Sequence, residues 1–149
     1  MEIGKLFIVA TPIGNLKDIT LRALETLKKA DFVAAEDTRI ARKLLVHYGL
    51  KKPLLGLHKH SLETAYLKIE ERLARGESGA LVSDAGTPGI SDPGPELARR
   101  VRAKFPEVEI IPIPGPSALT AALSIAGLNA DRFTFLGYPP RKKGRKTFF

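Results

Sequence analysis

The chain has 149 residues, a length that suits one domain or one domain with the beginning of another. Hydrophobic residues make up 44% of it and charged residues 27%, which is ordinary for a soluble globular protein. Cysteine is absent, which excludes disulfides and thiolate metal sites and fits the reducing cytoplasm, where we expect the protein to reside. The net charge of +8 favours a polyanionic partner, although many basic proteins bind no nucleic acid.

No stretch reaches the roughly 18 uninterrupted apolar residues that a membrane span needs, so we expect no membrane contact. The N-terminal segment has a short apolar core, but it runs directly into a strand-and-glycine pattern. We therefore interpret it as a first β-strand and not as a signal peptide.

Apolar runs alternate with amphipathic stretches along most of the chain. The apolar runs predict five strands, at Leu6–Ala10, Phe32–Ala35, Leu54–His58, Gly79–Val82 and Val108–Ile111. The amphipathic stretches predict helices at Thr20–Lys29, Thr38–Tyr48, Leu62–Ala74, Pro95–Lys104 and Ser117–Ala126. Continuous apolar strands are typical of a sheet covered by helices on both faces. The predicted fold is α/β, with a mostly parallel five-stranded sheet and right-handed crossovers.

The composition changes after the last predicted helix. Arg132–Leu136 predicts one more strand, and a basic run, Arg141–Lys146, follows it. We place a domain boundary between residues 129 and 130, so that 1–129 form an N-terminal α/β domain and 130–149 a linker and the start of a second, missing α/β domain. The basic run is also typical of a solvated tail. Because two aromatic residues end the chain, we interpret it as a truncated sequence or the ordered part of a longer one.

Three loops rich in glycine and proline follow predicted strands. They are Ala10–Asn15, Ser83–Gly94 and Ile113–Ala118. Glycine lets a backbone approach a ligand closely, and proline stiffens a loop. Because the carboxyl ends of parallel strands meet at one edge of a sheet, these loops predict a small-ligand site there. The structural alternative is that each loop is only a turn or a helix start, which holds best for the third loop.

Glu36-Asp37-Thr38-Arg39 follows the second predicted strand at the same edge. In one interpretation Asp37 or Thr38 caps the next helix and Arg39 pairs with an acid. In the other, the carboxylates orient or deprotonate a substrate hydroxyl and Arg39 binds phosphate. The sequence leaves both open.

His58 and His60 stand at the end of the third predicted strand, where alternation would put both imidazoles on one face. We predict no metal site, since there is no third ligand cluster and no cysteine. Histidine titrates near neutral pH, so a role as a general base fits these residues.

Six motifs occur in a fixed order, and together they resemble the ribosomal RNA small subunit methyltransferase I family, which is part of the tetrapyrrole methylase-like group. The motifs are VATPIGNLKDIT (Val9–Thr20), AAEDTR (Ala34–Arg39), LHKH (Leu57–His60), LVSDAGTPGISDPG (Leu81–Gly94), PGPSA (Pro114–Ala118) and DRFTFLGYPP (Asp131–Pro140). The resemblance implies a homodimeric enzyme that uses S-adenosylmethionine to methylate a cytidine ribose 2′-oxygen in small-subunit (16S) ribosomal RNA. Its substrate would be that RNA or the assembled small ribosomal subunit.

The resemblance also implies where the cofactor binds, in a cleft between two domains. The implied contacts in this chain are Pro12, Ile13, Gly14, Gly86, Thr87, Pro88, Ile90, Ser117 and Ala118. Many tetrapyrrole methylases have aspartate where this chain has Thr87, so Asp84 is expected to supply the carboxylate. This difference argues against a porphyrin-type substrate.

The remaining site residues follow from the motifs and the charge. We expect Glu36, Asp37 and His58 to be catalytic, and the RNA-binding residues to be Arg39, His60, Arg141, Lys142 and Lys143. The alternative functions are a tetrapyrrole methylase of the same fold and a non-catalytic RNA-binding module. Because the second domain would supply one wall of the cleft, we expect the 149-residue chain to fold but to bind cofactor weakly and transfer no methyl group.

Overall fold

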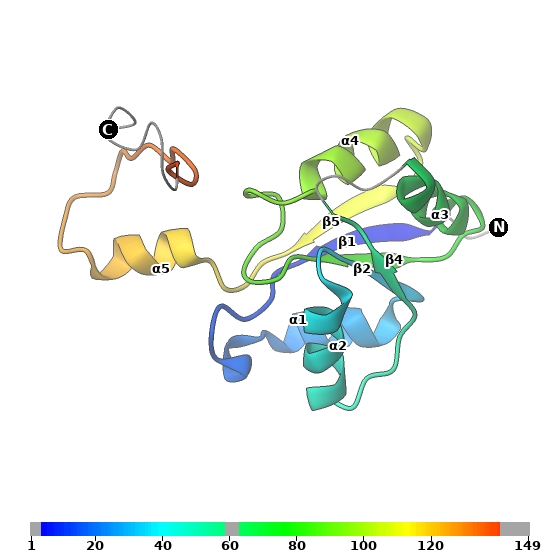
Figure 1. Ribbon diagram of the computed structural model, residues 1–149, viewed down its shortest axis with the longest axis horizontal. Helices are drawn as coiled ribbons and strands as arrows, with labels where there is room; N and C mark the ends of the chain where they lie inside the picture. Colours follow the sequence, from blue (N-terminus) through cyan, green and yellow to red (C-terminus); the bar gives the residue numbers. More distant parts are fainter. Residues whose placement is uncertain (1–3, 59–62, 141–149) are drawn as a thin grey trace. The chain divides into compact units, whose positions relative to one another are not determined.

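The structure, a computed structural model, describes residues 4–58 and 63–140. The chain divides into two compact units, Met1–Ala118 and Leu119–Phe149, which are described separately. The first unit contains a twisted sheet with helices on both faces (Figure 1). It carries all the elements that position the candidate site.

The sheet has five strands, all parallel, in the order β3-β2-β4-β1-β5. They are β1 (Lys5–Val9), β2 (Phe32–Ala35), β3 (Leu54–Gly56), β4 (Gly79–Val82) and β5 (Glu109–Ile113). The last residues of the strands are aligned across the sheet, in the order Gly56, Ala35, Val82, Val9 and Ile113. The predicted α/β fold with a parallel sheet is confirmed, and its aligned strand ends bring the loops that follow them to one edge.

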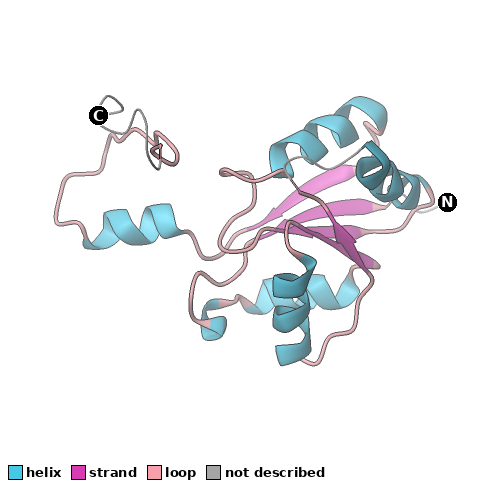
Figure 2. Ribbon diagram, viewed as in Figure 1, coloured by secondary structure: helices cyan, strands magenta, loops and turns pink. Residues whose placement is uncertain are grey.

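Helices α1 (Leu21–Lys29) and α2 (Thr38–His47) cover one face, and α3 (Glu63–Ala74) and α4 (Gly94–Lys104) cover the other (Figure 2). Phe32 and Ala34 of β2 pack in the core beneath α3 and α4. Val33 and Ala35, which alternate with them, pack in the core beneath α1 and α2. Because both faces are buried, every position of β2 must be apolar, which explains the unbroken apolar run in the sequence.

Local side-chain chemistry sets where the helices begin and end. Thr20 caps α1 by accepting a hydrogen bond from the backbone N–H of Ala23 at 3.0 Å. Asp37 caps α2 by accepting from the N–H of Arg39 at 2.8 Å. Gly49, which follows α2, has a φ of +67°, a conformation that favours glycine.

Three strands differ in their bounds from the prediction. β1 is shifted by one residue, to Lys5–Val9. β3 ends at Gly56, and the N–H of Leu57 makes a further bond to the C=O of Ala35 at 2.8 Å. The pairing of β2 with β3 ends at Ala35 and Gly56, so the predicted end of β3 at His58 is wrong. β5 extends to Ile113 and includes Pro112, which an edge strand tolerates.

The second unit contains most of α5 (Ala118–Ile125), none of whose residues is buried. The strand predicted over Arg132–Leu136 does not form, because a strand needs a neighbour with which to exchange backbone hydrogen bonds. The side chains of Phe133, Phe135 and Leu136 are instead at least half exposed. The boundary predicted between residues 129 and 130 stays a prediction, and the basic run Arg141–Lys146 lies outside the described residues.

Candidate active site

The three glycine- and proline-rich loops contact one another at the carboxyl edge of the sheet. Thr11 and Gly86 exchange two backbone hydrogen bonds, each of 3.0 Å, so the loops after β1 and β4 form a short antiparallel bridge. The hydroxyl of Thr87 donates to the C=O of Pro116 at 3.1 Å, which joins the β4 loop to the loop after β5. The sequence motifs therefore meet in space as the sheet topology predicts.

Gly86 stands at the centre of this junction, with a φ of +84°. A Cβ placed there would lie 3.4 Å from Cγ2 of Ile13 and 3.6 Å from the C=O oxygen of Pro116. Glycine is therefore required for the backbone conformation, and a larger side chain would push against both neighbouring loops. A ligand held by backbone groups of all three loops would depend on this residue.

The other predicted cofactor residues occupy the same loops. Ile13, Gly14 and Ile90 are exposed, whereas Gly86 and Pro88 are buried. Thr87, Asp84 and Ser117 are half-buried, and Ala118 is exposed at the start of α5. A ligand can therefore reach the exposed residues of these loops, while Gly86 and Pro88 are packed inside the protein.

Asp92 shapes the second half of the β4 loop, and the sequence analysis missed it. One carboxylate oxygen accepts from the N–H groups of Gly89 at 2.7 Å and Ile90 at 3.0 Å, and the other accepts from Gly94 at 2.7 Å. Ser91, inside this turn, has a φ of +65°. The Ser-Asp-Pro-Gly sequence is a signal for such a turn, because aspartate side chains often bond to nearby backbone N–H groups.

Acidic groups gather beside the loops. Asp84 accepts a hydrogen bond from the backbone N–H of Asp37 at 2.9 Å, which ties the segment after β2 to the β4 loop. Burial raises the pKa of Glu36 above its ordinary value, and the carboxylates of Asp84 and Asp92 raise it further. His58 opposes this shift by favouring the charged form. Glu36 therefore holds a proton more readily than an exposed glutamate does.

Asp37 has a different environment. Its carboxylate caps α2 and also accepts from Nε of Arg39 at 3.0 Å and from the terminal nitrogen at 2.6 Å. These hydrogen bonds hold the pKa of Asp37 well below its usual range. The capping and ion-pair geometry of the structural interpretation is present, whereas a proton-accepting role suits Glu36 better.

Several predicted residues cannot be placed. His60, Arg141, Lys142 and Lys143 lie outside the described residues.

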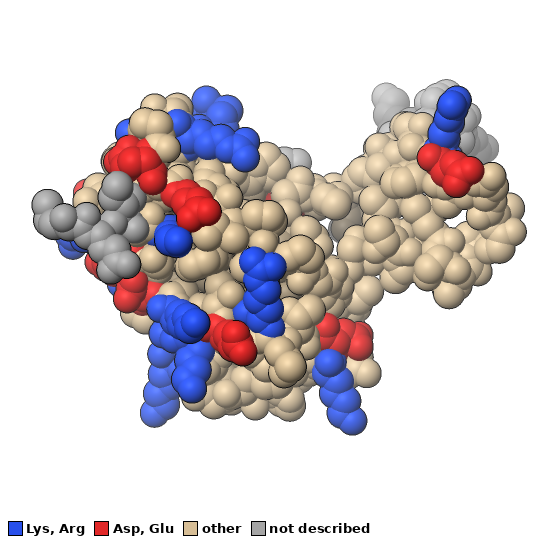
Figure 3. All heavy atoms as spheres, turned by 180° about the vertical axis from the view of Figure 1, so that it is seen from behind, with Lys and Arg blue, Asp and Glu red and all other residues tan. Residues whose placement is uncertain are grey.

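Within residues 4–58 and 63–140, no three His, Asp or Glu side chains converge as metal ligands. In the same ranges, no helix is both long enough and apolar enough to cross a bilayer. Lys and Arg side chains are interspersed with acidic ones on the face shown in Figure 3.

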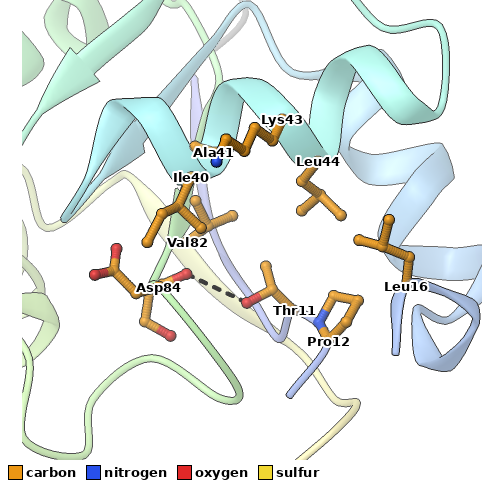
Figure 4. A pocket seen from close by; sticks show the side chains of 10 residues that line it. Thr11, Pro12, Leu16, Ile40, Ala41, Lys43, Leu44, Val82 and Asp84 are labelled. Atoms are coloured by element: carbon orange, nitrogen blue, oxygen red, sulfur yellow. Dashed lines mark hydrogen bonds between the residues drawn. The ribbon is translucent and has the colours of Figure 1, made fainter. Parts of the chain in front are cut away.

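A cavity of about 270 Å³ opens between the β1 loop, α2 and the end of β4 (Figure 4). Its described lining residues are Thr11, Pro12, Leu16, Ile40, Ala41, Lys43, Leu44, Val82, Ser83 and Asp84. The hydroxyl of Thr11 donates to the C=O of Ser83 at 3.2 Å, which joins two of the lining residues. Most of the lining is apolar, so the cavity suits an apolar group.

The profile of the tetrapyrrole (corrin/porphyrin) methylases matches residues 5–145. The chain is 55% identical over 139 residues to the ribosomal RNA small subunit methyltransferase I of Xylella fastidiosa, which covers 93% of this chain and 50% of that protein. It is 51% identical over 144 residues to the protein of the same name from Haemophilus influenzae, with 96% and 50% covered. The chain thus spans about half the length of these curated relatives.

Solved structures agree in fold. The uroporphyrin-III-C-methyltransferase of Thermus thermophilus superposes with a TM-score of 0.61 at 24% identity, covering 84% of this chain and 53% of that one. A putative cobalamin synthesis related protein from Corynebacterium diphtheriae superposes with a TM-score of 0.60 at 14% identity, covering 87% and 60%. With the profile match over nearly the whole sequence, these findings show that the chain belongs to the tetrapyrrole methylase family.

Proposed function

We propose that the complete protein transfers a methyl group from S-adenosylmethionine to the ribose 2′-oxygen of a cytidine in small-subunit ribosomal RNA. The observation that carries this proposal is the identity of about one half, over more than nine-tenths of the chain, to proteins named ribosomal RNA small subunit methyltransferase I. The net charge of +8 suits an RNA substrate.

The three joined loops support a cofactor site. Gly86 has a φ of +84° at their junction, and a Cβ there would contact Ile13 and the C=O of Pro116. Pro12, Ile13 and Gly14 would contact the ligand from one side and Thr87, Pro88 and Ile90 from the other, with Ser117 and Ala118 from the third loop. The cofactor supplies an electrophilic methyl group, so the protein has mainly to orient the two reactants and exclude water.

Glu36 is the proposed base. A ribose hydroxyl is a weak acid, and a carboxylate with a raised pKa accepts its proton more readily than an ordinary one. His58, close enough to influence Glu36, would stabilise the charged carboxylate before the proton arrives. Asp37 would orient Arg39, whose side chain is exposed. Arg39 would bind RNA phosphate, and the other RNA-binding residues would be His60, Arg141, Lys142 and Lys143.

The relatives' additional length suggests what completes the site. We propose that a second domain forms the other wall of the cofactor cleft and that the cytoplasmic enzyme is a homodimer. The 149-residue chain by itself would then bind cofactor weakly and transfer no methyl group, because one side of the ligand would stay in water.

The test is to incubate the full-length protein with cofactor labelled on its methyl group, and with either deproteinised small-subunit RNA or assembled small subunits. Label in RNA, mapped by mass to a cytidine ribose, is the expected result. Label only in an added tetrapyrrole, or RNA binding without transfer, would overturn the proposal. Comparing the two RNA samples identifies the preferred substrate.

A further inference from the structure

The cavity beside α2 borders the proposed cofactor loops through Thr11, Pro12, Ser83 and Asp84, but its other lining residues lie outside those loops. Leu16, Ile40, Leu44 and Val82 surround its centre (Figure 4). Its polar lining residues are Thr11, Ser83, Lys43 and Asp84. An apolar pocket with a few polar groups is what a protein uses to hold a base taken out of a nucleic-acid stack.

Asp84 and Lys43 provide the cavity with both a hydrogen-bond acceptor and a donor. Asp84 uses one carboxylate oxygen to accept from the N–H of Asp37, and an ionised carboxylate has further lone pairs with which to accept. Lys43 can only donate. A base that presents an amino group to Asp84 and a ring nitrogen or carbonyl to Lys43 would satisfy both. Carboxylates accept from the exocyclic amino group of cytosine in this way.

Helix α2 carries positive charge beside the cavity. Lys43 lines the cavity, and the exposed Arg39 lies four residues before it, on the same side of the helix. Arg42 is also exposed but lines a different pocket, with Leu45 and Val46. Cations at such spacing can contact successive phosphates of a strand whose base enters the cavity. Among the described lining residues, none belongs to the third loop, Ile113–Ala118, which argues against the cavity as the adenine site of the cofactor.

We infer that this cavity receives the unstacked, amino-bearing base of the target nucleotide, with the α2 cations binding the adjoining phosphates. The inference rests on the proposed function and adds the position at which the RNA is read. Asp84 would then contribute to base selection, and the ribose of the same nucleotide would stay outside, on the side of Glu36 and the loops.

The test combines a protein variant that fills the cavity with an RNA that lacks the base of the target nucleotide. In Ile40→Trp the indole would fill the cavity, and the fold should tolerate it because Ile40 is 42% exposed. Leu67→Trp is the matched control, since Leu67 is 40% exposed and lies on α3, on the opposite face of the sheet. Affinity is measured for RNA with its mapped target nucleotide intact or abasic, using the full-length protein and each variant.

For the wild type and Leu67→Trp, removal of the base should weaken binding at least about tenfold, which corresponds to roughly 1.4 kcal/mol. For Ile40→Trp, intact and abasic RNA should bind equally, while affinity for S-adenosylmethionine stays that of the wild type. An equal penalty for base removal in the wild type and Ile40→Trp would overturn the inference. So would a selective loss of cofactor affinity in Ile40→Trp, which would assign the cavity to the cofactor.

The two proposals can fail separately. If the wild type methylates RNA but base removal costs the same in all three proteins, only the cavity assignment is wrong. If the wild type transfers no methyl group to any RNA, the proposed function is wrong and the inference falls with it.

Discussion

Two glutamates, Glu70 on α3 and Glu36 directly after β2, have opposite environments. Glu70 of α3 is 3% exposed and accepts from Nε of Arg100 at 2.6 Å and from Nζ of Lys104 at 2.7 Å. Burial alone would raise the pKa of Glu70, but these hydrogen bonds lower it below its ordinary value. Glu36, after β2, is surrounded by the carboxylates of Asp84 and Asp92, and its pKa is raised.

The difference separates a structural carboxylate from a candidate reactive one. The charge of Glu70 is compensated by two cations that join α3 to α4, so its ionised form belongs to the folded state. The acids around Glu36 leave its charge only partly compensated, and such groups cluster at functional sites. The comparison therefore predicts that changes at Glu36 affect chemistry and changes at Glu70 affect stability.

The largest effect is expected from Glu36→Gln, which keeps the shape of the side chain and removes its ability to accept a proton. Methyl transfer by the full-length enzyme should fall by about 10²–10⁴-fold, while the midpoint of thermal unfolding stays equal or rises. Asp37→Asn is the matched control, because it removes a neighbouring charge but keeps a capping side chain. A larger loss of turnover in Asp37→Asn than in Glu36→Gln would reverse the assignment of the base.

Gly86→Val tests whether the loop end of the sheet binds the cofactor. Valine fits poorly at a φ of +84° and would press on Ile13, so affinity for S-adenosylmethionine should fall about tenfold or more by calorimetry. Gly49→Val imposes a similar backbone strain, at +67°, with no atom within 4 Å of the added Cβ. Equal cofactor affinity in the two variants would remove Gly86 from the site.

Glu70→Gln should destabilise the fold without changing the chemistry. The amide cannot match the two charge-assisted bonds, so the free energy of unfolding should fall by about 1–3 kcal/mol in urea titrations. Lys104 is half exposed and can turn to water, and Arg100 keeps its pairing with Glu63, which limits the loss. Unchanged stability together with reduced kcat would contradict the structural role of Glu70.

The smallest effect is the dependence of these stability differences on pH. The folded pKa of Glu70 is lowered, so its contribution is present above the ordinary glutamate pKa of about 4.3 and is lost as pH falls through the folded value. The folded pKa of Glu36 is raised, so its ionisation costs stability at neutral pH, and that cost disappears as pH falls through the folded value. Unfolding titrations of both Gln variants from pH 7 downward should show differences of opposite sign, of which that of Glu36→Gln shrinks first, above about pH 4.3, and that of Glu70→Gln only below it.

The fold could be predicted from the sequence because its signals are local. The apolar runs at Phe32–Ala35 and Gly79–Val82 coincide with strands β2 and β4, and Asp37, one of the two caps proposed for the second helix, caps α2. Their order along the chain, combined with the handedness of crossovers, places the loops at one edge.

The electrostatics of the site could not be predicted in the same way. The raised pKa of Glu36 depends on burial and on Asp84 and Asp92, which lie far from it in sequence. The cavity beside α2 needs Leu16, Ile40 and Val82 to meet in three dimensions, and none of them is unusual in its own segment. The predicted strand at Arg132–Leu136 failed for a related reason, since strand formation depends on a partner that local sequence does not specify.

The edges of the sheet bear on how the protein avoids aggregation. The C=O of Ile113 bonds to the N–H of Ala10, so the alternation along β5 turns the backbone nitrogen of Pro112 to the outer side, where proline has no hydrogen to donate. The opposite edge, β3, is only three residues long. Short or proline-containing edges are poor templates for an added strand, so the sheet resists edge-to-edge polymerisation with other copies.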